Sequence, residues 1–119
     1  MHIIIIEDQL DLADLMKSIL EKGGHSVVIH PTRWQAIQTA RSFNPDVVIS
    51  DYLIPHDMEM PKFLEAIRTL STLKCVIIMS GYKEAKAMAN QCQAEFILKP
   101  FTVQDISAKI NACVRATPN

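Results

Sequence analysis

The sequence predicts an α/β fold in which a parallel sheet is covered by helices on both faces. Five short apolar runs, rich in β-branched residues, alternate with longer segments that have helical spacing. The runs are continuous rather than alternating in polarity, which is typical of strands buried on both faces. Strands that alternate with helices form right-handed βαβ units and therefore a parallel sheet.

The expected strands are residues 2–7, 25–30, 46–50, 74–80 and 95–99. The expected helices are residues 10–22, 33–43, 61–70, 83–92 and 102–113. Gly23 and Gly24 end the first helix, and Pro61 occupies the favoured first position of the third. Thr102 and Asp105 form a pair that resembles a capping box at the start of the last helix.

Helical spacing predicts which apolar residues each helix turns toward the sheet. The residues concerned are Leu12, Leu15, Met16, Ile19 and Leu20, then Trp34, Ile37, Ala40 and Arg41, then Phe63, Leu64, Ile67 and Leu70, and last Val103, Ile106, Ile110 and Cys113. Trp34, the only tryptophan, is interpreted as a packing residue rather than a functional one. Residues 83–92 are rich in alanine and give the weakest helical signal.

Length and composition limit the class of protein. The 119 residues suit one domain, which we expect over residues 1–115, with 116–119 as a tail or the start of a linker. A net charge of −1 gives no basic footprint for nucleic acid. No apolar run approaches the ~20 residues of a membrane span, and the acidic start does not resemble a signal peptide. We therefore expect a cytoplasmic domain with neither a membrane nor a nucleic acid as partner.

The three cysteines also suggest a cytoplasmic location. Cys75, Cys92 and Cys113 are odd in number, far apart, and lack a Cys-x-x-Cys spacing. They are interpreted as reduced, structural thiols rather than as a metal site or a disulfide framework.

Polar residues follow four of the five expected strands. Glu7 and Asp8 follow the first, Asp51 the third, Ser80 the fourth and Lys99 the fifth. Ligands of such folds bind beyond the carboxyl ends of the strands, so these side chains should converge at one edge. Singly, each has a simpler explanation, since Asp8 could cap a helix, Ser80 could belong to a turn and Lys99 could be solvated.

Taken together, the three acids indicate a cation site. Two unit charges 4 Å apart repel by ~4 kcal/mol at an effective dielectric of 20. A cluster of carboxylates therefore suits a bound Mg²⁺, which takes a few protein oxygens and completes its octahedron with water and phosphate oxygens.

Four motifs give these residues a family context. The segments "IIIIED", "VVISDYLIP", "VIIMSGY" and "FILKPF" resemble, in this order, the motifs of receiver domains of two-component response regulators, such as the chemotaxis regulators. The resemblance covers essentially the whole chain. It implies a flavodoxin-like sheet of strand order 2-1-3-4-5 with five helices. It also implies Mg²⁺-dependent transfer of a phosphoryl group from a phosphohistidine to an aspartate.

The resemblance implies a role for each matching residue. Asp51 would be the phosphoacceptor and a metal ligand. Asp8 would bind Mg²⁺ directly, Glu7 through water, and Leu53 through its backbone carbonyl. Lys99 and Ser80 would contact phosphoryl oxygens. Phe96 occupies the family's aromatic switch position and would respond together with Ser80, although a plain core phenylalanine is the alternative; the Lys99–Pro100 bond would be cis.

Two segments depart from the family's pattern. Glu59 stands where a glycine usually lets the loop turn into the third helix, so Asp57 or Pro61 would have to help the loop turn. His56 of this loop is either a plain exposed residue or a contact of the phosphoryl group. Between Ser80 and Phe96 the chain is shorter by roughly one helical turn of ~3.6 residues, and Gln93 replaces the family's glycine. We therefore expect a short or irregular fourth helix.

These residues suggest three possible functions. The first is a phosphoacceptor switch, with a histidine kinase or phosphotransfer protein upstream, an output domain or protein downstream, and a possible homodimer. The second is a degenerate receiver, a protein-interaction module that no longer responds to phosphorylation. The third, an aspartate-nucleophile phosphatase, needs an acid where Leu53 stands, and no Gly-rich phosphate loop indicates a nucleotide site.

Overall fold

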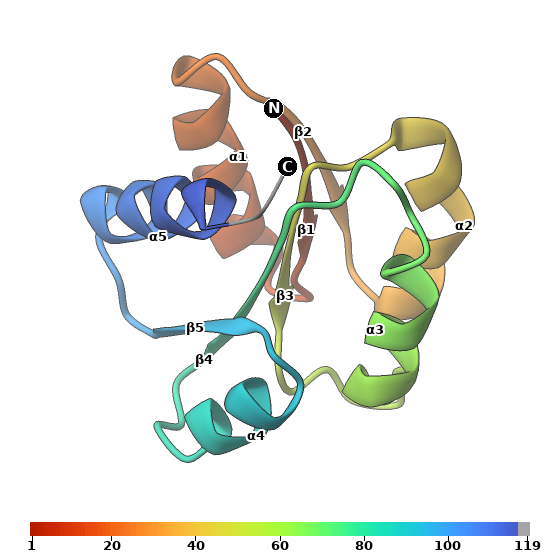
Figure 1. Ribbon diagram of the computed structural model, residues 1–119. Helices are drawn as coiled ribbons and strands as arrows, with labels where there is room; N and C mark the ends of the chain where they lie inside the picture. Colours follow the sequence, from red (N-terminus) through yellow and green to blue (C-terminus); the bar gives the residue numbers. More distant parts are fainter. Residues whose placement is uncertain (117–119) are drawn as a thin grey trace.

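A computed structural model describes residues 1–116 and has one parallel sheet of five strands in the order β2-β1-β3-β4-β5 (Figure 1). The strands are β1 (His2–Ile6), β2 (Ser26–His30), β3 (Val47–Asp51), β4 (Cys75–Ser80) and β5 (Glu95–Leu98). The helices are α1 (Leu10–Lys22), α2 (Arg33–Phe43), α3 (Met60–Ile67), α4 (Ala85–Gln91) and α5 (Val103–Arg115). The predicted fold class and strand order are confirmed, and of the expected tail only Ala116 lies within the described residues.

The sheet separates two apolar cores. Helices α1 and α5 cover one face, and α2, α3 and α4 cover the other (Figure 1). Alternate residues of β1 serve the two sides, since Ile3 and Ile5 join one core and Ile4 and Ile6 the other. All residues of the inner strands β3 and β4 are buried, whereas the edge strands β2 and β5 are partly exposed. This burial explains the continuous apolar runs in the sequence.

The expected helix faces are only partly right. Leu70, expected in the third helix, lies beyond the end of α3 at Ile67 and is half-buried. Phe63, Leu64 and Ile67 are buried as predicted. Leu15 is 58% exposed and Trp34 49% exposed. In α1 the contact with the sheet is made by Met16 and Leu20, as predicted, and by Ala13, which was not predicted. The apolar stripe of the sequence is therefore wider than the surface that each helix buries.

The fourth helix is short, as the sequence predicts. It has 7 residues and ends in a tight turn, in which the Gln93 N–H donates to the carbonyl of Asn90 and the Ala94 N–H to that of Ala89. Gln93 has a φ of 57°, in the left-handed region that favours glycine. Gln93 thus adopts, without being glycine, a conformation that favours glycine.

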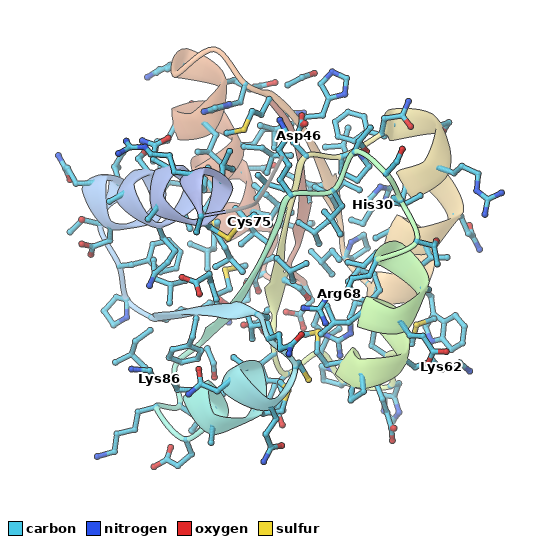
Figure 2. The ribbon with its side chains drawn as sticks, in the orientation of Figure 1. His30, Asp46, Lys62, Arg68, Cys75 and Lys86 are labelled. Carbon is cyan, nitrogen blue, oxygen red and sulfur yellow. A yellow bond between two sulfur atoms is a disulfide. The ribbon has the colours of Figure 1, made fainter. Side chains whose placement is uncertain are left out.

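The prediction of three reduced thiols is wrong. Cys75, the first residue of β4, and Cys113, in the last turn of α5, form a disulfide with a Cα–Cα distance of 5.7 Å (Figure 2). Only Cys92 is free among the described residues. The pairing escaped prediction because the two positions are 38 residues apart and become neighbours only when α5 packs back across β4.

No helix in residues 1–116 is both long enough and apolar enough to cross a membrane.

Relief of the left-handed strain at Gln93 is one testable consequence. We expect Gln93→Gly to raise the free energy of unfolding by roughly 0.5–1 kcal/mol. The backbone strain that glycine relieves in the folded protein should exceed the extra entropic cost of ordering glycine on folding. Urea unfolding measures the change. Asn44, also left-handed with a φ of 56°, provides the matched control, and Asn44→Gly should have a smaller effect because asparagine tolerates this conformation. Equal effects at both positions would contradict the strain argument.

The disulfide should contribute measurably to stability. We expect Cys113→Ser to lower the free energy of unfolding by about 2–4 kcal/mol, because the bond closes a long loop in the unfolded chain. A reducing agent should produce the same loss in the wild-type protein and none in the variant. Cys92→Ser is the control, since Cys92 forms no disulfide. Equal stability with and without reductant would argue against a bridge in solution.

Candidate functional site

The carboxyl ends of the strands bring the predicted acids together. Glu7 and Asp8 follow β1, and Asp51 is the last residue of β3. One carboxylate oxygen from each of the three residues lies within 4.8 Å of the other two. Asp8 is exposed, whereas Glu7 is fully buried and Asp51 is 9% exposed. The cluster is therefore open to solvent mainly on the Asp8 side.

Lys99 joins this cluster from β5. Its Nζ lies 2.7 Å from Oε2 of Glu7 and 2.9 Å from Oδ1 of Asp51. Burial acts to lower the pKa of Lys99, but the hydrogen bonds to the two carboxylates outweigh burial and raise this pKa. Burial raises the pKa of the Glu7 carboxyl, in spite of hydrogen bonds from Lys99 and from the backbone N–H of Gln9. One half-buried ammonium thus offsets part of the repulsion among three acids.

Glu7, rather than Asp8, accepts a hydrogen bond from the backbone just before α1. The residue before the helix is Gln9, which makes no side-chain cap, and its N–H donates to Oε1 of Glu7 over 3.1 Å. The alternative of Asp8 as a helix cap is therefore wrong, and its carboxylate stays available at the surface.

Ser80 and Phe96 lie on neighbouring strands beside the cluster. Ser80 is 3% exposed, and its Oγ accepts a hydrogen bond of 3.0 Å from the N–H of Tyr82. Its carbonyl accepts one of 2.8 Å from the N–H of Lys99. Phe96 is half-buried against the core on the side of α2, α3 and α4, so its ring is neither fully packed nor free. The Lys99–Pro100 bond is cis, as the resemblance implied.

The loop from β3 to α3 turns at His56 and not at the glycine position of the family. Glu59 has a φ of −65° and a ψ of 144°, an extended conformation that any residue adopts, and it precedes α3 directly. His56 is exposed and left-handed, with a φ of 58°. Leu53, whose carbonyl was expected to bind metal, has a side chain that is largely solvent-exposed (55%). The replacement of glycine by Glu59 therefore requires no unusual conformation there.

Two buried charged residues behind Asp51 were missed in the sequence. Arg33, the first residue of α2, and Asp57 of the loop have side chains 5% and 0% exposed, with Nε 3.7 Å from Oδ2. Helical spacing could have revealed Arg33, because it precedes Ala36 and Ala40 on the face of α2 that packs on the sheet. No sequence pattern indicated Asp57 as its partner, since loop acids are usually exposed.

The donor set fits a small divalent cation. Carboxylate oxygens from three residues are the hard ligands that Mg²⁺ prefers, and Asp8 leaves one side open to water. No sulfur or imidazole belongs to the cluster, so the residues do not favour zinc or another softer metal.

The comparisons with known proteins identify the family. Its model, described as the response regulator receiver domain, matches residues 3–111. The chain therefore belongs to the receiver domains of two-component response regulators, which are phosphoacceptor signalling domains.

Relatives of known name agree with this family. The chain is 20% identical over 116 residues to the alkaline phosphatase synthesis transcriptional regulatory protein PhoP of Bacillus subtilis, covering 95% of this chain and 48% of that protein. It is 22% identical over 116 residues to the KDP operon transcriptional regulatory protein KdpE of Escherichia coli, covering 96% and 51%. The chain thus spans about half the length of these curated relatives, and 20% of the length of the transcription factor SKN7 of Candida albicans.

Solved structures have the same fold. A response regulator receiver domain protein of Clostridium thermocellum is 26% identical, with a TM-score of 0.82 over 96% of this chain and 94% of that chain. The chemotaxis protein CheY4 of Vibrio cholerae is 20% identical, with a TM-score of 0.81 over 94% and 97%.

The raised pKa of Glu7 makes the stability of the metal-free protein depend on pH. Because the folded protein holds this proton more tightly than the unfolded chain, Glu7 lowers stability as the pH rises above about 4.5. We expect Glu7→Gln to abolish this contribution, so its stability relative to wild type should rise from pH 4.5 toward neutrality and then level off. Urea unfolding of both proteins in chelator-treated buffer measures the difference. A stability difference between the two proteins that does not change with pH would contradict the raised pKa of Glu7.

Proposed function

We propose that Asp51 accepts a phosphoryl group in a Mg²⁺-dependent reaction and that this modification changes an output surface of the domain. The observation that supports this most is the position of the Asp51 carboxylate. It stands at the end of a fully buried strand, 2.9 Å from Nζ of Lys99 and beside the carboxylates of Glu7 and Asp8. A buried strand that fixes its position, a nearby cation and two further acids together meet the needs of a nucleophile at a metal site.

Each residue has a distinct part in this reaction. An Asp51 oxygen attacks the phosphorus of a phosphohistidine, the N–P bond breaks, and an acyl phosphate and a free imidazole result. Asp8, Asp51 and the Leu53 carbonyl would hold Mg²⁺, and Glu7 would hold it through water. When bound, the ion would neutralise the charge that gathers on the phosphoryl oxygens.

Lys99 and Ser80 act on the phosphoryl group. The ammonium of Lys99 already lies against Asp51, so it can pair with a phosphoryl oxygen there after a small displacement. Ser80 would exchange its hydrogen bond from Tyr82 for one to another phosphoryl oxygen. The half-buried ring of Phe96 would then move into the space that Ser80 leaves.

The modification would act as a switch between two conformations. A phosphoryl group adds ~1.5 to 2 negative charges, enough to bias states that differ by a few kcal/mol. We propose that a histidine kinase or phosphotransfer protein donates the phosphoryl group. The output surface would then act on an output domain or protein, or on a second copy of the chain. A cytoplasmic location suits these partners, although the cysteines no longer support it, since two of them are bridged.

A degenerate receiver is the weaker candidate. The short α4 is the one structural feature in its favour, because it alters a surface of the domain. Against it, this member of the family has all five polar residues that the resemblance assigns to the site. Its three acids also lie close enough to share a cation.

Intact mass measurement tests the phosphoacceptor directly. Incubation with acetyl phosphate and Mg²⁺ should add a single phosphoryl group to the wild-type protein, and chelation of Mg²⁺ should prevent it. Asp51→Asn should abolish the adduct, because the amide is not a nucleophile. The exposed Asp14 of α1 provides a matched control, and Asp14→Asn should be modified like wild type. An adduct that persists in Asp51→Asn would place the phosphoacceptor elsewhere.

A further inference from the structure

A buried ion pair lies directly behind Asp51 and has no part in the reaction proposed above. It consists of Arg33 and Asp57, which come from the start of α2 and from the loop between β3 and α3. Within residues 1–116, no buried side-chain nitrogen or oxygen is left without a hydrogen-bond partner, so this pair is fully satisfied. Its contacts connect three segments of the chain.

Arg33 fastens both ends of the loop. Its Nη1 donates to the carbonyl of Asp51 over 2.9 Å and to Oγ of Ser50 over 3.3 Å. Its Nε donates to the carbonyl of Met58 over 2.8 Å. Asp51 precedes the loop and Met58 lies near its end, so one planar guanidinium holds the two ends together.

Asp57 fastens the same loop to α2. Its Oδ2 accepts from the N–H of Arg33 over 2.7 Å, and its Oδ1 from the N–H of Trp34 over 3.3 Å and that of Met58 over 2.7 Å. The first two of these donors belong to the first turn of α2, where intrahelical partners are lacking and negative charge is favourable. The carboxylate cannot leave without exposing three donors.

Two further contacts hold the start of the loop: the N–H of Tyr52 donates to the carbonyl of Met79 over 2.9 Å, and the side chain of Ile54 is buried in the core. The three glycines of the chain, Gly23, Gly24 and Gly81, all lie elsewhere, and the loop turns through the left-handed His56. The side chain of Leu53, between Tyr52 and Ile54, is 55% exposed, so it adds little packing of its own to fix the carbonyl expected to bind metal.

We propose that the Arg33–Asp57 pair positions the carboxylate of Asp51 and the carbonyl of Leu53, and thereby sets the Mg²⁺ affinity and phosphorylation rate of the site. Both are positioning residues, since neither touches the metal or the phosphoryl group. Mutation of residues that contact a metal ligand without touching the metal typically lowers metal affinity or activity 10–100-fold. The inference rests on the proposed function of Asp51.

Two variants separate positioning from folding. Arg33→Met combined with Asp57→Asn removes both charges, so no unpaired charge is buried, while the asparagine oxygen can still accept from the start of α2. Arg33→Lys keeps the charge but replaces the fork by a single ammonium, which cannot serve all three acceptors. Ile67→Val is the control, because it loosens the buried face of α3 without touching the pair.

The first measurement is the dissociation constant of Mg²⁺ alone, by calorimetry, with the fold of each variant checked by circular dichroism. The second is the rate of phosphorylation by acetyl phosphate at saturating Mg²⁺. We expect the double variant to bind Mg²⁺ about tenfold more weakly and to react more slowly, with a smaller loss for Arg33→Lys. Ile67→Val should lower the unfolding midpoint and leave both the affinity and the rate unchanged.

Each outcome decides a separate point. Wild-type Mg²⁺ affinity and rate in the folded variants would overturn the positioning role and leave the pair as a support of the fold. If the double variant does not fold, Arg33→Lys decides by the same comparison. A wild-type protein that binds Mg²⁺ but forms no adduct would overturn the proposed function. The Mg²⁺ affinities of the variants would then still test the positioning role of the Arg33–Asp57 pair. Absence of Mg²⁺ binding in wild type would overturn both.

Discussion

The contact between the Lys99 ammonium and two carboxylates is the interaction on which the functional edge of this domain depends. A parallel sheet delivers the ends of all its strands to one edge, so acids that follow β1 and β3 are forced together. Without a cation their repulsion would oppose the pairing of these strands. Lys99 supplies that cation from β5, the last strand along the chain, and thus links the edge of the sheet to its centre.

Most of the fold could be predicted because it follows from burial. Each strand lies within one residue of its predicted limits, since a strand buried on both faces must be continuously apolar. The convergence of the site residues followed from topology alone. Helix orientation was less predictable, because the sequence of α2 favoured Trp34 as a partner of Ala40 at the sheet, where the structure has Ala36.

The features that escaped prediction are contacts between distant positions. The bridge between Cys75 and Cys113 depends on where α5 ends relative to β4, which no local pattern records. The burial of Arg33 and Asp57 likewise requires both partners to be known, since either charge alone would be too costly to bury. Removal of one partner from such a pair typically costs 3–5 kcal/mol, so the two residues are expected to change together in related chains.

The disulfide also limits how this domain can move. It joins the first residue of β4 to the last turn of α5, at the end of the sheet opposite Ser80 and Lys99. The first turn of α5, in contrast, comes shortly after Lys99 in the chain. While the bond is intact, Cys113 holds the last turn of α5 against the start of β4. A displacement that began at the polar edge would therefore move α5 most near Val103 and least at Cys113.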